Sequence, residues 1–297
     1  MEQKLSIILP AKNEAKSLKG LLPLLQKNFP DDEIIVINDG STDSTKEVCE
    51  QNQVRVISHI YSLGNGAAIK TGARIAEGNI LVFMDADGQH DPNDISRLIE
   101  KINNGYDMVV GARHLDSHAS LARRIANTIY NRLASWMTGY PIEDLTSGFR
   151  AARARHFRKF LYLLPNKFSY PTTSTMAFFR SGLPVGYVPI KAMQRTGDRK
   201  SHIRLFHDGL RFLIIIIKIG ALFSPMRFFL PISALLFFMG LSYYGYTYFT
   251  AGRLTNMSTI LLLSSLFTFL IGIVSEQISA LHYKDIQETR RNILRSE

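Results

Sequence analysis

The sequence predicts an α/β domain with a mostly parallel sheet, followed by two membrane-spanning helices. Two observations lead to this prediction. Over about the first two thirds of the chain, short apolar runs alternate with segments of helical periodicity, which is the pattern of a sheet with helices on both faces. From Phe228 to Leu281 the residues are almost wholly apolar. The 297 residues are enough for one sizeable domain plus this appendage.

The elements of the α/β domain follow in order along the chain. Strands are expected at five short, β-prone runs: Leu5–Leu9, Glu33–Ile37, Val54–Ile57, Ile80–Met84 and Met108–Val110. Helices are expected between them at Glu14–Lys27, Thr42–Gln51, Asn65–Glu77 and Pro92–Asn103. We see no internal repeat and no low-complexity linker, so a single domain is expected over residues 1–202.

The segment Ser120–Thr138 is predicted to be a basic amphipathic helix. Its apolar stripe consists of Leu121, Ile125, Ile129, Leu133, Trp136 and Met137. Arg123, Arg124 and Arg132 lie elsewhere on the helix. A helix packed on the core would show such a stripe, and so would a helix lying in a membrane interface, where basic residues and Trp are typical. Both settings stay open.

Residues 203–224 form a second unusual segment. It begins with Arg204, His207 and Arg211, and Lys218 and Gly220 interrupt the apolar run that follows. The run is too interrupted for a membrane span. We therefore expect an interfacial amphipathic helix that leads into the membrane.

Residues 225–283 are expected to contain two transmembrane helices, at about 228–250 and 260–281. Each stretch has about twenty or more residues, the length that crosses roughly 30 Å of hydrocarbon at 1.5 Å per residue. A buried hairpin in a soluble core is the weaker alternative for two segments of this length. Four tyrosines near the far end of the first stretch fit an aromatic belt.

Charge predicts the orientation of this hairpin. Lys and Arg are frequent on both flanks, whereas the connecting loop Ala251–Thr259 carries only Arg253. The positive-inside rule therefore puts both flanks, including a basic tail at 284–297, in the cytoplasm. The apolar run Leu5–Leu9 is too short for a signal peptide. We expect an integral protein of the plasma (inner) membrane with its α/β domain and both termini cytoplasmic.

The richest local signal is Asp85-Ala86-Asp87, which ends the apolar run Ile80–Met84. Functional groups gather at the carboxyl ends of strands in such sheets. Two carboxylates can hold Mg²⁺ together with substrate phosphates. The alternative is a plain strand end followed by a helix start at Asp91-Pro92. An EF-hand is excluded because His90 and Ser96 occupy the positions of its Gly and Glu.

Composition narrows the classes of partner. The net charge of +10 favours phosphates or anionic lipid. Nucleic acid is disfavoured because the positive charge clusters beside the membrane segments without interleaved aromatic residues. Cys49 is the only cysteine, which excludes an intrachain disulfide and a cysteine-based metal site.

Several motifs occur in a fixed order along the chain. They are Pro10-Ala11-Lys12-Asn13-Glu14, Asn38-Asp39-Gly40-Ser41, Gly64-Asn65-Gly66, Asp85-Ala86-Asp87-Gly88-Gln89, Gly111-Ala112-Arg113, Thr146-Ser147-Gly148-Phe149-Arg150 and Arg195-Thr196-Gly197 before Lys200-Ser201-His202. Over roughly residues 5–205 this set resembles family 2 glycosyltransferases of GT-A fold. It is most similar to the polyprenyl-phosphate glycosyltransferases, which include dolichyl-phosphate mannose synthase and bacterial undecaprenyl-phosphate glycosyltransferases.

The resemblance implies a site residue by residue. The metal-binding positions are Asp85, Asp87 and Gln89. Nucleotide-sugar contacts fall on Pro10, Lys12, Glu14, Ile37, Asp39, Ala86, Asp87, Arg113, Lys200 and Ser201. The catalytic set would be Asp85, Asp87, Arg113 and Arg195. We add Arg124, Arg132, Ser147 and Arg150 as candidates to bind the acceptor phosphate, because guanidinium groups hold phosphates bidentately.

The chain departs from the family pattern at three places. Lys12 stands where an aromatic residue is common, and Asn38 replaces the first Asp of D-D-G-S. In the loop from Arg195 to His202, Arg195 is only two residues before Gly197, and His202 stands where Lys is common. Single motifs also have plain structural explanations: Asp39-Gly40-Ser41 as a turn and cap, Gly64-x-Gly66 as tight packing at a helix start.

The expected function is transfer of a hexose from a UDP- or GDP-sugar to undecaprenyl or dolichyl phosphate at the cytosolic face, with Mg²⁺ or Mn²⁺ as cofactor and with inversion at the sugar. Two alternatives stay open. One is a polysaccharide synthase of the same superfamily, although its Q-x-x-R-W is absent. The other is a non-catalytic membrane adaptor with a degenerate GT-A domain. The sequence does not distinguish a monomer from a homo-oligomer.

Overall fold

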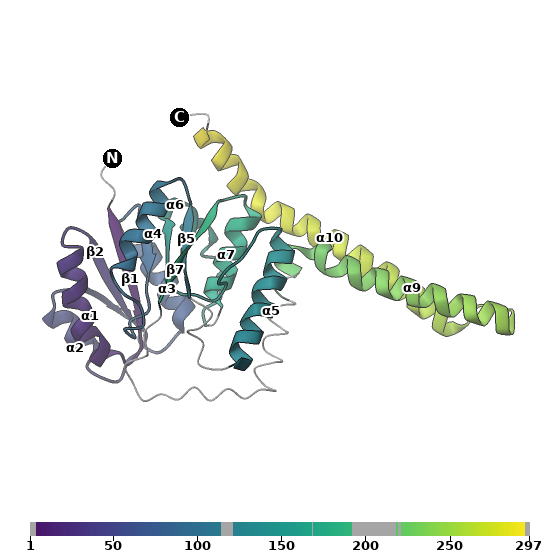
Figure 1. Ribbon diagram of the computed structural model, residues 1–297, viewed down its shortest axis with the longest axis horizontal. Helices are drawn as coiled ribbons and strands as arrows, with labels where there is room; N and C mark the ends of the chain where they lie inside the picture. Colours follow the sequence, from purple (N-terminus) through teal and green to yellow (C-terminus); the bar gives the residue numbers. More distant parts are fainter. Residues whose placement is uncertain (1–3, 114–120, 168, 192–217, 219–220, 295–297) are drawn as a thin grey trace. The chain divides into compact units, whose positions relative to one another are not determined.

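The computed structural model describes residues 4–113, 121–167, 169–191, 218 and 221–294, with only the backbone described at 121–126 and 282–294. The chain divides into two compact units (Figure 1). The first lies within residues 1–135 and 140–200, and the second within residues 136–139 and 201–297. Each unit is described below by itself.

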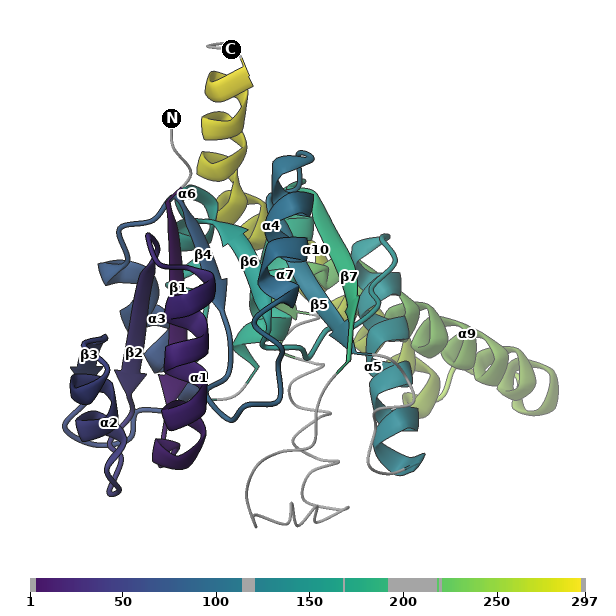
Figure 2. The same cartoon turned by 60° about the vertical axis from the view of Figure 1, so that its left-hand side comes forward.

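The first unit is built on a seven-stranded sheet with the order β3-β2-β1-β4-β6-β5-β7 (Figure 2). Its strands are β1 Leu5–Ala11, β2 Glu33–Asn38, β3 Arg55–Ser58, β4 Ile80–Phe83, β5 Met108–Arg113, β6 Arg150–Arg153 and β7 Val185–Ile190. β6 pairs antiparallel with β4 and β5, and the other neighbouring pairs are parallel. The mostly parallel α/β class predicted from the sequence is therefore confirmed.

Helices cover both faces of this sheet. They are α1 Ala15–Asn28, α2 Thr45–Gln51, α3 Asn65–Ile75, α4 Asp94–Asn103, α6 Ala154–Phe157 with the 3₁₀ turn η2 Arg158–Phe160, and α7 Tyr170–Arg180. A further helix, α5 Leu121–Thr138, begins in this unit, and its last residues belong to the second. Side chains alternate across β1: Ile7 and Leu9 pack with the buried residues of α1 and α4, which lie in front of the sheet in Figure 2. Ile8, on the other face, contacts α3 at Gly72.

Every strand and helix expected up to Thr138 is present, with ends shifted by a few residues. The elements β6, α6, α7 and β7 are not predicted from the sequence. Two of these break the usual patterns, because β6 begins with the fully buried Arg150 and β7 contains Gly186 and Pro189.

The start of α3 shows why Gly66 is needed. A Cβ on Gly66 would lie 2.0 Å from the carbonyl oxygen of Pro165. The segment that follows Pro165 is tied to the same turn, since Gly66 N donates to Lys167 O (3.3 Å) and Ala67 N donates to Asn166 O (2.8 Å). These contacts support tight packing at a helix start as the role of Gly66.

We expect Gly66→Ala to lower the free energy of unfolding by about 1–3 kcal/mol, the usual cost of overpacking. The matched control is Gly20→Ala in α1, where a Cβ would meet nothing within 4 Å. That control should be neutral or stabilising by about 0.5–1 kcal/mol, because Ala suits a helix interior better than Gly. Thermal unfolding of the two purified variants measures the difference, and equal midpoints would contradict the packing argument.

Helix α5 has a buried face, as a helix packed on the core would have, and also an exposed apolar face, as an interfacial helix would have. Tyr130, Ala134 and Met137 are buried. Ile129 and Trp136, from the predicted stripe, are instead largely exposed. The buried face is thus one position away from the predicted one, and an apolar, partly basic face is left at the surface.

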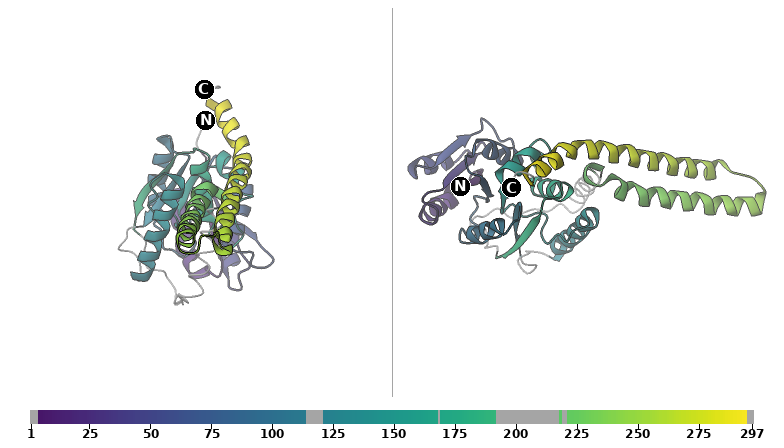
Figure 3. Two further views of the ribbon diagram at one scale, coloured as in Figure 1. Left: turned by 90° about the vertical axis from the view of Figure 1, so that its right-hand side faces the viewer. Right: turned by 90° about the horizontal axis from the view of Figure 1, so that it is seen from above.

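The second unit is dominated by a pair of long helices, α9 Pro225–Ala251 and α10 Asn256–Leu294 (Figure 3). Residues 225–251 and 256–281 are long and apolar enough to cross a membrane. The hydroxyls of Ser233 and Ser265 each donate to the other residue's carbonyl oxygen, at 2.9 and 3.0 Å. Gly240 lets α9 approach Leu261 and Leu262 of α10 closely.

These helices lie where the sequence predicts the two spans. The structure differs at the C-terminal side, where α10 continues without a break to Leu294 through part of the predicted basic tail. Most of the predicted interfacial helix at 203–224 lies outside the described residues.

Candidate active site

One edge of the sheet collects most of the positions predicted to be functional. The carboxyl ends of β1, β2, β4 and β5 point to the same edge because these strands run in one direction. The segments that follow them contain Lys12 and Glu14, Asp39, the acidic motif 85–89 and Arg113 at the end of β5. Ligand sites of open α/β sheets lie at this edge.

The two carboxylates of the acidic motif differ in exposure: Asp87 is buried and hydrogen-bonded, whereas Asp85 is partly exposed. Asp87 is 8% exposed, and its Oδ1 accepts a hydrogen bond from the backbone N of Gln89 (3.1 Å). Gly88, with φ of 75°, allows the chain to turn between them. The side chain of Asp85 is 38% exposed. Asp87 is therefore held by its own turn, while Asp85 has an oxygen surface that faces solvent.

The donor chemistry of this motif fits a hard divalent cation. Among the residues that the structure describes, no group of three or more His, Cys, Asp or Glu side chains is arranged to hold a metal. The ligands that this motif could offer are the two carboxylates of Asp85 and Asp87 and the amide oxygen of Gln89. Mg²⁺ is usually bound in this way, with one or two carboxylates and with substrate phosphates completing the shell.

His90 lies beside the acid pair and is neutral. Its ring stacks on Phe149 at a centroid distance of 4.9 Å, and its Nε2 lies 3.9 Å from Oδ2 of Asp85. Burial lowers the pKa of His90 to about 4, despite the nearby charge of Asp87. The imidazole therefore adds no positive charge next to the carboxylates.

Arg113 is paired with a carboxylate that the sequence reasoning missed. Its Nε and Nη2 donate to the two oxygens of Asp144, at 2.9 and 3.2 Å, and Nη2 also donates to Oγ1 of Thr146 (2.7 Å). Burial would raise the pKa of Asp144, but the hydrogen bonds and charge of Arg113 outweigh it and lower the pKa below its usual value. Asp144 is thus ionised and fixes the direction of the guanidinium.

Asp144 also shapes the loop that passes the acid pair. Its Oδ1 accepts hydrogen bonds from the backbone N of Thr146 (3.0 Å) and of Ser147 (3.1 Å). Gly148 then lies against Asp85, since a Cβ on Gly148 would be 3.1 Å from Oδ2 of that carboxylate. The Arg113–Asp144 pair and Asp85 therefore belong to one connected site.

Arg150 and Ser147 require a correction. Both are predicted to bind an acceptor phosphate, but Arg150 is fully buried and Ser147 is 1% exposed. Arg150 Nη1 donates to Pro171 O, Ser174 Oγ and Thr175 Oγ1 at 2.8–3.1 Å, and its Nη2 donates to Ser147 O. A guanidinium enclosed by these acceptors cannot reach a phosphate at the surface. Arg150 instead holds the loop against α7.

Asp39 has all its acceptor positions occupied. Its Oδ1 accepts from His59 Nδ1 and Leu63 N, both at 2.8 Å, and its Oδ2 accepts from Ser62 Oγ (2.7 Å) and Gly64 N (2.9 Å). A carboxylate offers about four lone-pair positions. Burial would raise the pKa of Asp39, but these four hydrogen bonds outweigh it and lower the pKa. The contacts in the structure are structural, and the nucleotide contact of Asp39 stays a prediction.

We expect Asp39→Asn to destabilise the fold by about 1–3 kcal/mol, because the amide group would face one of the donors and leave it unsatisfied. The thermal unfolding midpoint of the purified variant, without any ligand, measures this effect. Asn38→Ala provides a comparison at the adjacent position, since it removes a neutral side chain that makes two hydrogen bonds, to Ser58 Oγ and from Ser41 N. An unchanged midpoint for Asp39→Asn would show that the loop 59–64 does not depend on this carboxylate.

The other predicted nucleotide contacts divide by exposure. Lys12 is exposed, and Pro10 and Glu14 are half-buried. Ile37 and Ala86 are buried, so their side chains are not available to a ligand and only their backbone could contribute. The apolar side chains of these two residues belong to the core, and their nucleotide contacts stay predictions.

Of the remaining predicted site residues, one is exposed and the others lie outside the part of the chain that the structure describes. Arg132 is exposed on α5. Arg195, Lys200 and Ser201 lie outside the described residues, as does the side chain of Arg124. Their predicted contacts to donor or acceptor stay predictions.

Two side chains of the site, Asp144 and His59, were not predicted from the sequence. Asp144 precedes the motif Thr146–Arg150 by two residues, and that position is the signal that could have found it. His59 links Asp39 to Thr71 Oγ1 (3.0 Å). The same loop leaves Ile60 almost completely exposed and Tyr61 largely exposed beside the end of β2, where they offer an apolar surface next to the site.

The fold and the site together define a GT-A-like α/β domain with the acidic motif 85–89 at the carboxyl edge of its sheet. The chain matches the family model described as Glycosyl transferase family 2 over residues 6–162, and residues 224–281 match the GtrB C-terminal hairpin. The chain therefore belongs to glycosyltransferase family 2, as the sequence motifs indicate.

Similar curated proteins agree with this assignment. The chain is 31% identical over 201 residues to an uncharacterized protein of Methanocaldococcus jannaschii, covering 65% of this chain and 82% of that protein. It is 28% identical to the polyprenol monophosphomannose synthase of Mycolicibacterium smegmatis over 208 residues, covering 65% and 78%. It is 32% identical to the undecaprenyl-phosphate 4-deoxy-4-formamido-L-arabinose transferase of Photorhabdus laumondii over 164 residues, covering 52% of this chain and half of that one.

A solved structure shows the same fold. Glucosyl-3-phosphoglycerate synthase from Mycobacterium tuberculosis, crystallised with Mn²⁺ and UDP-glucose, superposes with a TM-score of 0.59 over 72% of this chain and 78% of that one. The sequence identity is 20%, so this similarity concerns the fold alone.

Proposed function

We propose that this glycosyltransferase moves a hexose from a nucleotide-sugar to a polyprenyl phosphate. The observation that carries the proposal is the pair Asp85 and Asp87 at the carboxyl edge of the sheet, in a chain that also contains two helices able to cross a membrane. The names of two relatives point to the same acceptor, since one is a polyprenol monophosphomannose synthase and another an undecaprenyl-phosphate transferase.

Asp85, Asp87 and Gln89 are proposed to hold Mg²⁺ or Mn²⁺, which as a Lewis acid would stabilise the leaving nucleoside diphosphate. Asp87 is held by its turn, and the side chain of Asp85 is 38% exposed, so a cation can reach it from solvent. His90 stays neutral and does not compete for the carboxylates. Arg113, directed by Asp144, contributes a positive charge beside the same site for a diphosphate or phosphate oxygen.

The acceptor phosphate is an anion before it reacts, so its oxygen can attack the sugar without a strong general base. This chemistry fits a single displacement with inversion at the sugar carbon, as the resemblance to the family implies. The exposed face of α5 with Arg132 and Trp136 is a candidate contact to lipid headgroups. Each basic residue near an anionic surface contributes about 1 kcal/mol to this attraction.

The membrane arrangement is part of the proposal. The two helices would hold the catalytic domain at the cytoplasmic face of the plasma membrane, with the basic flanks on the same side. This arrangement gives the enzyme access to a soluble sugar donor and a membrane-bound acceptor together.

The test is a transfer assay with purified full-length protein in detergent. A panel of radiolabelled UDP- and GDP-sugars is combined with undecaprenyl or dolichyl phosphate, in Mg²⁺, Mn²⁺ or EDTA. We expect one donor to give a lipid-extractable, monoglycosylated product that EDTA abolishes. A long product would support a polysaccharide synthase instead. No transfer and no hydrolysis of any donor by a folded, metal-replete protein would support the non-catalytic adaptor.

A further inference from the structure

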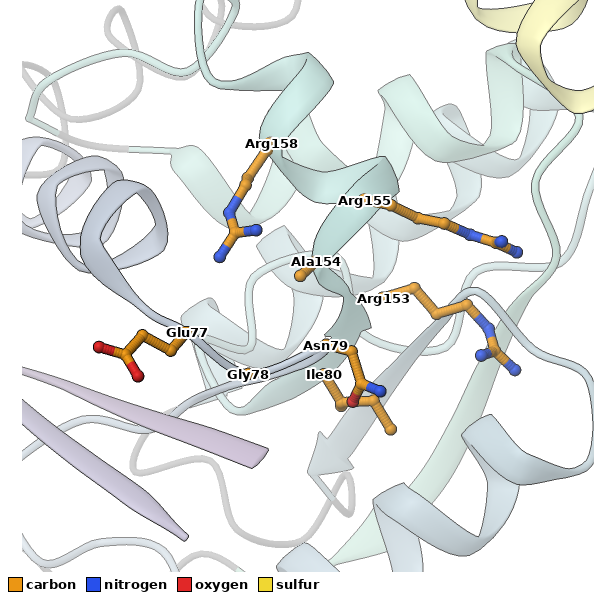
Figure 4. A pocket seen from close by; sticks show the side chains of 8 residues that line it. All are labelled: Glu77, Gly78, Asn79, Ile80, Arg153, Ala154, Arg155 and Arg158. Atoms are coloured by element: carbon orange, nitrogen blue, oxygen red, sulfur yellow. The ribbon is translucent and has the colours of Figure 1, made fainter. Parts of the chain in front are cut away.

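A pocket lies at the opposite end of β4 from the acid pair. It has a volume of about 340 Å³ and surrounds the first residue of the strand, Ile80, whereas Asp85 and Asp87 follow the last (Figure 4). Its lining consists of Glu77, Gly78, Asn79, Ile80, Arg153, Ala154, Arg155 and Arg158. Three of these eight side chains are arginines, and the proposed sugar transfer uses none of them.

The single acidic residue of the lining does not neutralise the arginines. The carboxylate of Glu77 lies 3.5 Å from Lys4 Nζ and 3.8 Å from an Nη of Arg55, both outside the lining. Figure 4 shows this carboxylate directed away from the three guanidinium groups. The positive charge of the lining is therefore not balanced by Glu77.

Arg158 is held rigidly but keeps its full charge. Its Nε donates to the carbonyl oxygen of Ala73 (2.8 Å) and its Nη2 donates to that of Ala76, at the C-terminal end of α3. Carbonyl oxygens orient a guanidinium without neutralising it. Fixed orientation favours anion binding, because less conformational entropy is lost when the ligand arrives.

The other two arginines differ in how they are paired. Arg153 donates to Ile102 O (3.0 Å) and its Nε lies 3.5 Å from Oδ1 of Asp107, so its charge is partly balanced. Arg155 Nε donates to Nε2 of His156 (3.0 Å), a ring nitrogen. Within the part of the chain that the structure describes, neither Arg155 nor Arg158 forms an ion pair with a carboxylate.

We propose that this pocket is a second anion site, which takes a phosphate-bearing ligand. Two arginines without acidic partners among the described residues line one concave space from different sides (Figure 4), and guanidinium groups recognise phosphate oxygens bidentately. The volume lies in the range of small-molecule sites. The ligand is a phosphomonoester or a free phosphate, or the phosphate of a lipid headgroup. The proposal does not depend on the proposed sugar transfer, and the site is separate from the acid pair.

The test is isothermal titration of the full-length protein in neutral detergent with inorganic phosphate, in EDTA so that the acidic motif carries no metal. We expect one binding event that weakens roughly tenfold or more in Arg155→Gln, because a charged hydrogen-bond partner is lost. Arg155→Lys should retain an intermediate affinity. The matched control, Lys19→Gln on α1, also removes one positive charge but lies outside the pocket lining and should bind as the wild type does.

The source of the phosphate is distinguished by a second titration, with glucose 1-phosphate against short-chain phosphatidylglycerol. Tighter binding of the sugar phosphate identifies a soluble ligand, and tighter binding of the lipid identifies a headgroup site. Arg155 is the chosen position because its side chain contacts only the neighbouring His156 ring among the hydrogen bonds described, so its loss should leave the thermal midpoint unchanged. Equal phosphate affinity in wild type and in a folded Arg155→Gln variant, or no binding by the wild type, overturns the proposal.

Discussion

The Asp87→Asn variant is expected to lose sugar transfer by about a thousandfold while keeping its fold. Asn has the same shape and can still accept the hydrogen bond from Gln89 N, so the turn should persist. It lacks the charge that would hold a divalent cation. A bound cation contributes several kcal/mol of transition-state stabilisation, and about 4 kcal/mol corresponds to roughly a thousandfold in rate.

The measurement is the initial rate of formation of lipid-extractable product at saturating Mg²⁺ or Mn²⁺, together with the thermal unfolding midpoint. Asp91→Asn is the matched control. It makes the same substitution four residues further on, where the carboxylate only caps the backbone N of Asn93 (2.9 Å). Full metal-dependent transfer by a folded Asp87→Asn variant would refute the metal-binding role of this residue.

The second large effect is expected from Asp144→Ala. The substitution leaves the guanidinium of Arg113 without its carboxylate and removes the acceptor that holds the backbone N of Thr146 and Ser147. Breaking a buried pair by removing one partner typically costs about 3–5 kcal/mol. The loop beside Asp85 then loses its anchor, so transfer should fall together with stability.

Thermal unfolding and the transfer assay measure the two consequences. Asp94→Ala is the matched control, because Asp94 also pairs with an arginine, Arg97, whose side chain is 48% exposed. It should cost about 1 kcal/mol or less. In the double variant with Arg113→Ala, part of the lost stability should return, since no unpaired charge is left. If Asp144→Ala is no less stable than Asp94→Ala, the pair does not hold the loop.

The core of the fold could be predicted because its strands are continuous apolar runs. Such runs as Ile80–Met84 identify buried parallel strands directly. β6 could not be found in this way, since Arg150 is buried there among carbonyl and hydroxyl oxygens rather than apolar groups. The same residue explains a wrong prediction: an arginine in a motif suggests a phosphate ligand, and only the packing of α7 shows which oxygens bind Arg150.

The candidate site divides in a similar way. Asp85 and Asp87 are separated by one residue and follow the end of a strand, so a local pattern was sufficient to find them. The partner of Arg113 is 31 residues away, and its pairing depends on how β5 and the following loop meet. For Asp39 the sequence indicated an acidic residue at a strand end. It could not indicate that four donors from the 59–64 loop occupy the carboxylate.

The two hydrogen bonds between Ser233 and Ser265 have a consequence for biosynthesis. When α9 enters a bilayer alone, its serine hydroxyl has only its own helix to bond with, and the exchange with Ser265 becomes available when α10 follows. Interhelical bonds of this kind are worth about 0.6 kcal/mol each on average. Because they form in only one register, they favour the correctly aligned pair over a slipped one. The two serines therefore help to specify how α9 aligns against α10.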